Sequence, residues 1–110
     1  MEGPSIRRFP RMSLGNPIDL RVGERTIRIE NPVGNLSVGG LFVHTEDLPV
    51  DTHVHVKIDA LHPIEADGVV RFCEPRGEGL GIEFTAVTEA NHKYLDELIA
   101  ELTLKGVLAS

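Results

Sequence analysis

The stretch HVHVKID, residues 53–59, alternates strictly between polar and apolar side chains. On an extended chain, Val54, Val56 and Ile58 fall on one side, and the histidines, the lysine and the aspartate fall on the other. Such alternation predicts a β-strand with one buried face and one face turned to solvent. We therefore expect a fold built from half-buried strands.

Segments of the same kind surround this strand, and each is closed by turn residues such as glycine, proline or asparagine. Their spacing of roughly ten residues is typical of an antiparallel barrel or sandwich rather than of alternating strands and helices. Gly68 inside the longest segment indicates a bulge or bend. In total we expect six or seven strands, with the others at residues 18–22, 26–30, 39–45, 64–74 and 80–84.

The end of the chain changes to a helical period. Thr88 is a good N-cap, Glu89 follows in the first turn, and Gly106 is a natural stop. These signals predict a helix over about 88–105, packed on an open end or flank of the sheet, with a partner helix or dimer seam as the alternative. Its apolar stripe consists of Tyr94, Leu95, Leu98, Ile99 and Leu102.

Bulk composition limits the possible function. The 110 residues suit one domain, and the single cysteine, Cys73, allows no internal disulfide. The N-terminus has no apolar signal region, and no apolar run approaches the ~20 residues that span a bilayer. We therefore expect a cytoplasmic protein without membrane insertion. The net charge of −6 argues against DNA or RNA as a partner.

Positive charge is nevertheless concentrated at the start of the chain. The run RRFPR places Arg7, Arg8 and Arg11 within five residues, without a lysine among them. Residues 1–15 contain glycines and prolines and show no period, so we expect a flexible arm ahead of a folded domain at 16–110. Arginine carries a planar fork of donors that grips a phosphate or a guanine edge. A local cationic site on an acidic body suits a small anion better than a polymer.

A second polar constellation lies in the segment NPVGNLSVGGLFV. Asn35 and Ser37 are two residues apart, so on an extended chain both side chains can face one ligand. Gly39 and Gly40 leave the backbone bare, which allows a flat ring to come close. The same residues also suit a tight turn between strands, and the turn interpretation is compatible with binding.

Together these residues resemble the PilZ domain family. Its two motifs, RxxxR and (D/N)xSxxG, read here as Arg7 to Arg11 and Asn35 to Gly40, in the right order and at the right separation. The stretches GLFV, VVRF and GLGIEF also look like later strands of the family. The resemblance implies an all-β fold, a six-stranded antiparallel barrel with a C-terminal α-helix.

The resemblance further implies a ligand, the bacterial second messenger cyclic di-GMP, and no cofactor or metal. By position, Arg7 and Arg11 would hold phosphate and the Hoogsteen edge of guanine, and Arg8 would add a phosphate contact or a stacking surface. Asn35 and Ser37 would hydrogen-bond a guanine lying against the barrel. Gly39 and Gly40 would keep that surface open.

The implied role is a receptor, not an enzyme, because no nucleophile and base occur in a recognisable arrangement. Binding would change the conformation of the arm and signal to an effector protein in motility, biofilm or exopolysaccharide control. The alternative is a PilZ-like adaptor that binds no nucleotide and serves type IV pilus or motility machinery.

Two smaller features allow other interpretations. His53 and His55 point to one side of a strand and could form half of a metal site with Asp51 nearby, although a solvent-facing strand surface is the simpler expectation. Cys73 has no partner thiol, so we expect no redox role.

Overall fold

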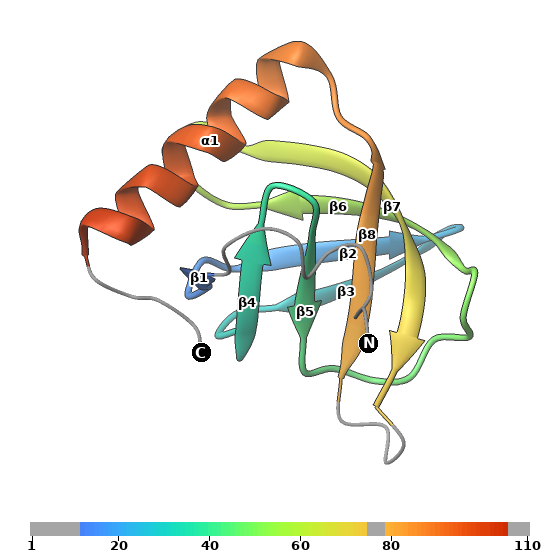
Figure 1. Cartoon of the computed structure of the whole chain (residues 1–110). Coiled ribbons are helices and arrows are strands. Elements are labelled where there is room, and N and C mark those ends of the chain that lie inside the picture. Colours follow the sequence, from blue (N-terminus) through green and yellow to red (C-terminus); the bar gives the residue numbers. More distant parts are fainter. Residues whose placement is uncertain (1–11, 75–78, 106–110) are drawn as a thin grey trace, which may run out of the picture.

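The computed structural model describes residues 12–74 and 79–105, which form eight strands and one helix (Figure 1). The strands are β1 (Met12–Ser13), β2 (Ile18–Val22), β3 (Arg25–Ile29), β4 (Gly34–Ser37), β5 (Gly40–Val43), β6 (His53–Ile58), β7 (Ile64–Cys73) and β8 (Leu80–Ala86), and the helix is α1 (Glu89–Leu104).

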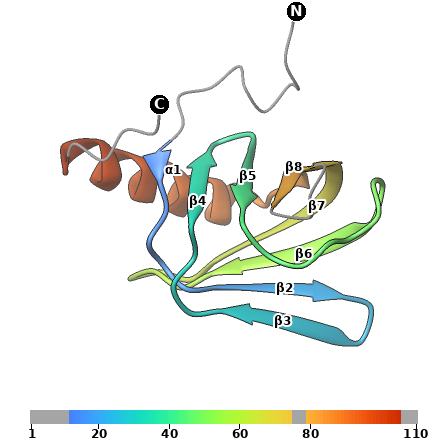
Figure 2. The same ribbon diagram turned by 90° about the horizontal axis from the view of Figure 1, so that it is seen from below.

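All strands belong to one antiparallel sheet with the order β1-β4-β5-β8-β7-β6-β2-β3. The sheet curls into a half-barrel, so that β4 and β5 lie across from β2 and β3 (Figure 2). The prediction of a mainly antiparallel β fold with one C-terminal helix is confirmed. Within the described ranges, β1 and β3 end the sheet and do not pair with each other.

The expected number of six or seven strands, and the six strands of the implied barrel, are too few, because the described residues form eight strands. The two additional strands are β1, in residues expected to belong to the irregular arm, and β4, in a segment that begins with turn residues. These strands have two and four residues, too few to show a period of two. Their extended conformation comes from pairing with neighbours, which local sequence does not reveal.

The core occupies the concave side of the sheet. On β6 the expected alternation is present, since Val54, Val56 and Ile58 are buried and His53 and Lys57 are exposed. Other strands contribute side chains with no exposed surface, such as Leu20 from β2 and Ile82 from β8. The largest fully buried side chains among the described residues are Ile18, Leu20, Leu36, Leu41, Val43, Val56, Ile58, Val70, Leu80, Ile82 and Leu95.

The bend predicted at Gly68 is also present. The register of β7 against β8 shifts between Asp67 and Gly68. A Cβ atom at Gly68 would lie 2.8 Å from the carbonyl oxygen of Glu83 and 2.8 Å from Cγ2 of Ile82. Glycine is therefore required where β8 approaches the backbone of β7 most closely.

Helix α1 begins and packs as its sequence predicts. The hydroxyl oxygen of Thr88 accepts a hydrogen bond from the Asn91 amide over 3.3 Å. Leu95, Leu98 and Leu102 are buried, which confirms the core-packing interpretation of the apolar stripe. The helix crosses the sheet from β7 to β1, and its last turn meets β1 where the Thr103 hydroxyl lies 3.6 Å from Sδ of Met12. Among the described residues, α1 is too short and too polar to cross a membrane.

Candidate nucleotide-binding site

The motif Asn35 to Gly40 forms the end of β4, a tight turn and the first residue of β5. In the pairing of these strands, Asn35 lies opposite Phe42 and Ser37 lies opposite Gly40. Leu36 between them is buried in the core, so Asn35 and Ser37 belong to the opposite, outer face of the sheet. The described residues of the second motif thus lie together at one end of β4 and the turn that follows it.

Ser37 is fully buried, and its hydroxyl closes the turn. The hydroxyl oxygen accepts a hydrogen bond from the amide of Gly39 over 3.2 Å and donates one to the carbonyl of Gly40 over 3.4 Å. A serine that bonds to the backbone two residues ahead is a common means of fixing a turn. The turn interpretation is therefore confirmed for Ser37.

Neighbouring strands fix the position of this turn. The carbonyl of Gly39 accepts a hydrogen bond from the amide of Phe84 on β8 over 2.9 Å, and Gly40 lies opposite Glu83. Gly40 is buried and Gly39 is partly exposed. At the other end of β4, a Cβ atom at Gly34 would collide with the carbonyl oxygen of Phe42. The start of β4 therefore requires glycine at position 34, and the turn after β4 is held by backbone hydrogen bonding to β8.

The predicted cations Arg7, Arg8 and Arg11 lie outside the described residues. The described chain begins at Met12, which pairs with Leu36, and Ser13 follows opposite Asn35. The amide of Leu14 then donates a hydrogen bond to the carbonyl of Gly34 over 3.2 Å. Strand β1 therefore joins the segment that follows the arginine motif to the strand that carries Asn35.

Aromatic side chains continue the outer face beyond the motif. The rings of Phe42 and Phe72 stack with centroids 6.0 Å apart, and His44 meets Phe42 edge-on. Phe42 covers Gly79 and Phe72 covers Gly81, where an added Cβ atom would come too close to the rings. Local sequence does not predict this cluster, because Phe42 on β5 and Phe72 on β7 are brought together only by the sheet order. The glycines in GEGLGIEF were the available signal.

An ion pair borders the same face. The Nε atom of Arg71 lies 2.6 Å from a carboxylate oxygen of Glu83, and its Nη1 lies 3.8 Å from Asp51. Glu83 is also the residue opposite Gly40. The positive charge of Arg71 is therefore balanced by carboxylates within the described part of the site, and a dianionic ligand would need cations from elsewhere in the chain.

A comparison with protein families matches residues 5–101 to the PilZ domain. The chain belongs to the PilZ domain family. Proteins of this family are receptor or adaptor domains. The match covers both motifs, including the three arginines that precede β1. A search of curated proteins finds no match to this PilZ chain.

Solved structures share the PilZ fold at low sequence identity. The structure of the Bacillus subtilis inhibitor of motility (MotI/DgrA) superimposes with a TM-score of 0.68 at 19% identity, covering 96% of this chain and 53% of that one. This PilZ chain thus spans about half the length of the Bacillus protein. The PilZ domain of YcgR from Escherichia coli, solved with c-di-GMP, gives a TM-score of 0.65 at 18% identity, covering 91% and 93% of the two chains.

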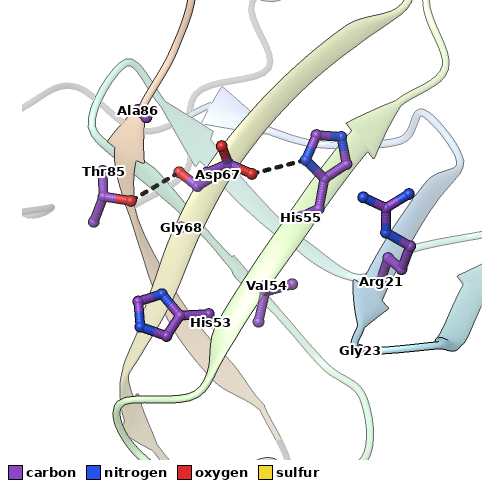
Figure 3. Close-up of a pocket in the computed structure, with 9 residues that line it drawn as sticks. All are labelled: Arg21, Gly23, His53, Val54, His55, Asp67, Gly68, Thr85 and Ala86. Carbon is purple, nitrogen blue, oxygen red and sulfur yellow. Dashed lines mark hydrogen bonds and ion pairs between the residues drawn. The ribbon is translucent and has the colours of Figure 1, made fainter.

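A separate polar pocket of about 450 Å³ lies over β2, β6, β7 and β8 of this PilZ domain, and Arg21, His53, His55 and Asp67 line it (Figure 3). Nδ1 of His55 lies 2.8 Å from Asp67, and its Nε2 lies 2.7 Å from Glu65. These hydrogen bonds, first that to Asp67 and then that to Glu65, raise the pKa of His55 above its usual 6.5.

The histidines of β6 and Cys73 allowed other interpretations, as part of a metal site and as a redox residue. In the described ranges 12–74 and 79–105, no three potential ligand side chains gather into a metal site, and His53 is exposed as expected for a strand surface. Cys73 is a partly buried strand residue whose thiol donates a hydrogen bond to the carbonyl of Leu48.

Proposed function

We propose that this PilZ domain is a receptor for cyclic di-GMP that signals to a partner protein controlling motility, biofilm formation or exopolysaccharide synthesis. Two facts about similar structures support this role: one was solved with c-di-GMP, and the other is named an inhibitor of motility. We further propose that the protein is cytoplasmic and has no catalytic activity.

The pairing of β1 with β4 is the observation that carries the proposal. Met12 pairs with Leu36 next to the amide-bearing Asn35. Arg11 is the residue that precedes Met12, and consecutive Cα atoms are about 3.8 Å apart. The arginine motif therefore leads directly into a strand that pairs with β4, which supports the proposal that the two motifs share one ligand.

The proposed contacts follow from the chemistry of each group. Arg7 and Arg11 bind phosphate and the O6 and N7 acceptors of guanine, and Arg8 adds a phosphate contact. The amide of Asn35 both donates and accepts, which suits the edge of a purine. The exposed backbone of Gly39 allows a base to lie against the turn.

Signalling in this proposal is a change in the arm. A dianionic ligand binds residues 7–11 and the outer face of β4 together, and the arm becomes ordered around it. Ordering costs about 1–2 kcal/mol for each residue fixed, and the charge-assisted hydrogen bonds to arginine must exceed that cost. The ordered arm presents a new surface to the partner.

One observation favours the alternative, a PilZ adaptor that binds no nucleotide. Ser37 has no exposed surface, and its hydroxyl already bonds to Gly39 and Gly40. A purely structural motif would have the same geometry.

Calorimetric titration with cyclic di-GMP distinguishes the two functions. We expect saturable binding to the wild-type chain and none of GMP at the same concentrations. If neither nucleotide binds to folded protein at low salt, the receptor role is wrong and the adaptor role stands. Low salt is required in this experiment because screening weakens contacts between arginine and phosphate.

A further inference from the structure

We propose that a groove between helix α1 and the loop joining β6 to β7 binds a basic segment of the partner protein through an apolar anchor. The groove has a volume of about 180 Å³ and is lined mainly by Leu61, His62, Tyr94, Glu97, Leu98 and Glu101. We call it the Leu61 groove. The inference rests on the proposed role as a receptor that signals to a partner protein, and it names the surface and the partner chemistry.

The apolar part of the groove is unusually open to water. The side chain of Leu61 is 92% exposed, the largest exposed fraction among the large hydrophobic residues that are described. A single exposed leucine is ordinary on a protein surface. Leu61, however, borders a groove with apolar walls, where the ring of Tyr94 stacks on His62 with centroids 4.6 Å apart. This wall is preformed and requires little rearrangement on binding.

A second exposed leucine lies along the same face of the helix. Leu104 is 89% exposed and follows Glu101 by three residues, and Glu97 precedes Glu101 by four. Residues three and four apart are neighbours on a helix surface. Leu61 at the groove and Leu104 in the last turn therefore flank a pair of glutamates, which gives an apolar surface with an acidic centre.

One of the two glutamates on this surface, Glu97, lacks an ion-pair partner among the described residues. Glutamates four residues apart on one helix face repel each other slightly. Glu101 is 3.3 Å from Lys105, an exposed pair, whereas Glu97 has no ion-pair partner in the described part of the chain. A partner with lysine or arginine beside a leucine or phenylalanine would complement both features. A volume of 180 Å³, about six water molecules, accommodates one such apolar side chain.

The position of the groove connects it to the nucleotide site. Helix α1 contacts β1, and the hydroxyl of Thr103 lies 3.6 Å from Sδ of Met12. Met12 directly follows the arginine motif, and Leu104 directly follows Thr103. A change in the arm therefore reaches the exposed end of the proposed docking surface through one side-chain contact.

Binding of designed peptides to the full chain tests this assignment. The first probe is a fluorescein-labelled peptide with two leucines flanked by arginines. The second peptide replaces the leucines by serine, and the third replaces the arginines by glutamate. We expect saturable anisotropy changes with the first peptide only, weakened by added salt. Amide shifts in nuclear magnetic resonance spectra are expected at residues 60–62 and 94–101.

Matched variants locate the site. Leu61→Ser is expected to weaken binding about tenfold, the scale of a central apolar anchor, and the double variant Glu97→Lys and Glu101→Lys by a similar factor. The control variants Val50→Ser and Glu24→Lys change an exposed valine and an exposed glutamate elsewhere, and should leave the affinity within about twofold. Undiminished binding to Leu61→Ser would overturn the proposal, as would shifts confined to another surface.

Two further measurements separate the remaining outcomes. If sedimentation velocity shows a dimer of the wild type that Leu61→Ser abolishes, the groove binds a second copy, and the assignment to a basic partner is wrong. Peptide binding is measured without nucleotide, and cyclic di-GMP titration of Leu61→Ser should match the wild type. Failure of the peptide experiment therefore leaves the receptor proposal intact, and failure of the nucleotide titration leaves the peptide result intact.

Discussion

Ser13 lies directly opposite Asn35 in the antiparallel pairing of β1 with β4. Only Met12 separates Ser13 from Arg11 in the sequence, so the arginine motif leads directly into the strand that pairs with the Asn35 segment. The PilZ domain thus uses its shortest strand to connect the two halves of the proposed nucleotide site.

Replacing Arg11 should reduce nucleotide binding without affecting the fold. We expect Arg11→Ala to cost about 2–3 kcal/mol of binding free energy, the scale of a charge-assisted or bidentate contact. Arg21→Ala is the matched control, because Arg21 is exposed on β2 and lines a different pocket. Calorimetry measures both affinities, and wild-type affinity of Arg11→Ala would contradict the site assignment.

Nucleotide binding should slow hydrogen exchange in the arm. We expect peptides covering residues 5–14 to gain protection when cyclic di-GMP is added, because the arginines become ordered on the ligand. Peptides covering β6 should exchange at the same rate with and without ligand. Unchanged protection of residues 5–14 at saturating nucleotide would rule out the proposed change in the arm.

Removing the hydroxyl of Ser37 should affect stability as well as binding. The variant Ser37→Ala loses the hydrogen bonds to Gly39 and Gly40, and leaving buried backbone groups unsatisfied costs about 1–3 kcal/mol. Urea unfolding measures this loss, and calorimetry on the folded fraction measures affinity. A variant as stable as the wild type would show that the turn does not depend on this hydroxyl.

A methyl group at Gly34 should disturb the pairing of β4 with β5. The added Cβ atom meets the carbonyl oxygen of Phe42, a backbone atom that cannot turn away. We expect Gly34→Ala to lower the free energy of unfolding by more than about 2 kcal/mol. Gly15→Ala is the control, because no atom lies within 4 Å of its added Cβ, and it should stay within about 0.5 kcal/mol.

His55 should make stability depend on pH. Hydrogen bonds to Asp67 and then Glu65 raise its pKa, against the smaller opposing effect of burial. The stabilisation is therefore complete below the unfolded-state pKa of about 6.5 and is lost as the pH rises through the higher folded-state pKa. The carboxylates are 51% and 63% exposed, so we expect less than about 1 kcal/mol.

Chemical unfolding at about pH 6 and about pH 9 measures this effect as a difference between the wild type and His55→Gln. The variant should lose the part of the pH dependence that His55 contributes. His53→Gln is the control, because His53 is exposed and no ion pair joins it to another residue that the structure describes. A wild type that becomes more stable as the pH rises across this range would contradict the sign.

The sequence predicts those strands and helices that are long enough to show a periodic pattern of apolar residues. Six residues of β6 alternate and sixteen residues of α1 carry an apolar stripe, so both elements are predictable. Strand β1 is not, because Met12 and Ser13 are extended only through their pairing with β4. Likewise, Pro32 and Gly34 give the start of β4 the composition of a turn, although Asn35 is already paired on both sides.

The candidate site, too, is predictable from the sequence in part only. The turn at Ser37, Gly39 and Gly40 follows from local chemistry and was predictable. The stacking of Phe42 on Phe72 was not, because the residues are thirty positions apart and meet only when β8 lies between β5 and β7. Arg71 also required the fold, since its carboxylate partners come from β8 and from the segment before β6.

The contact between Met12 and Thr103 makes the first and last parts of the described chain spatial neighbours. Fluorophores attached beside Met12 and Thr103 would therefore be close enough for energy transfer. If the proposed ordering of the arm occurs on nucleotide binding, their signal would report it, and the domain would serve as a sensor.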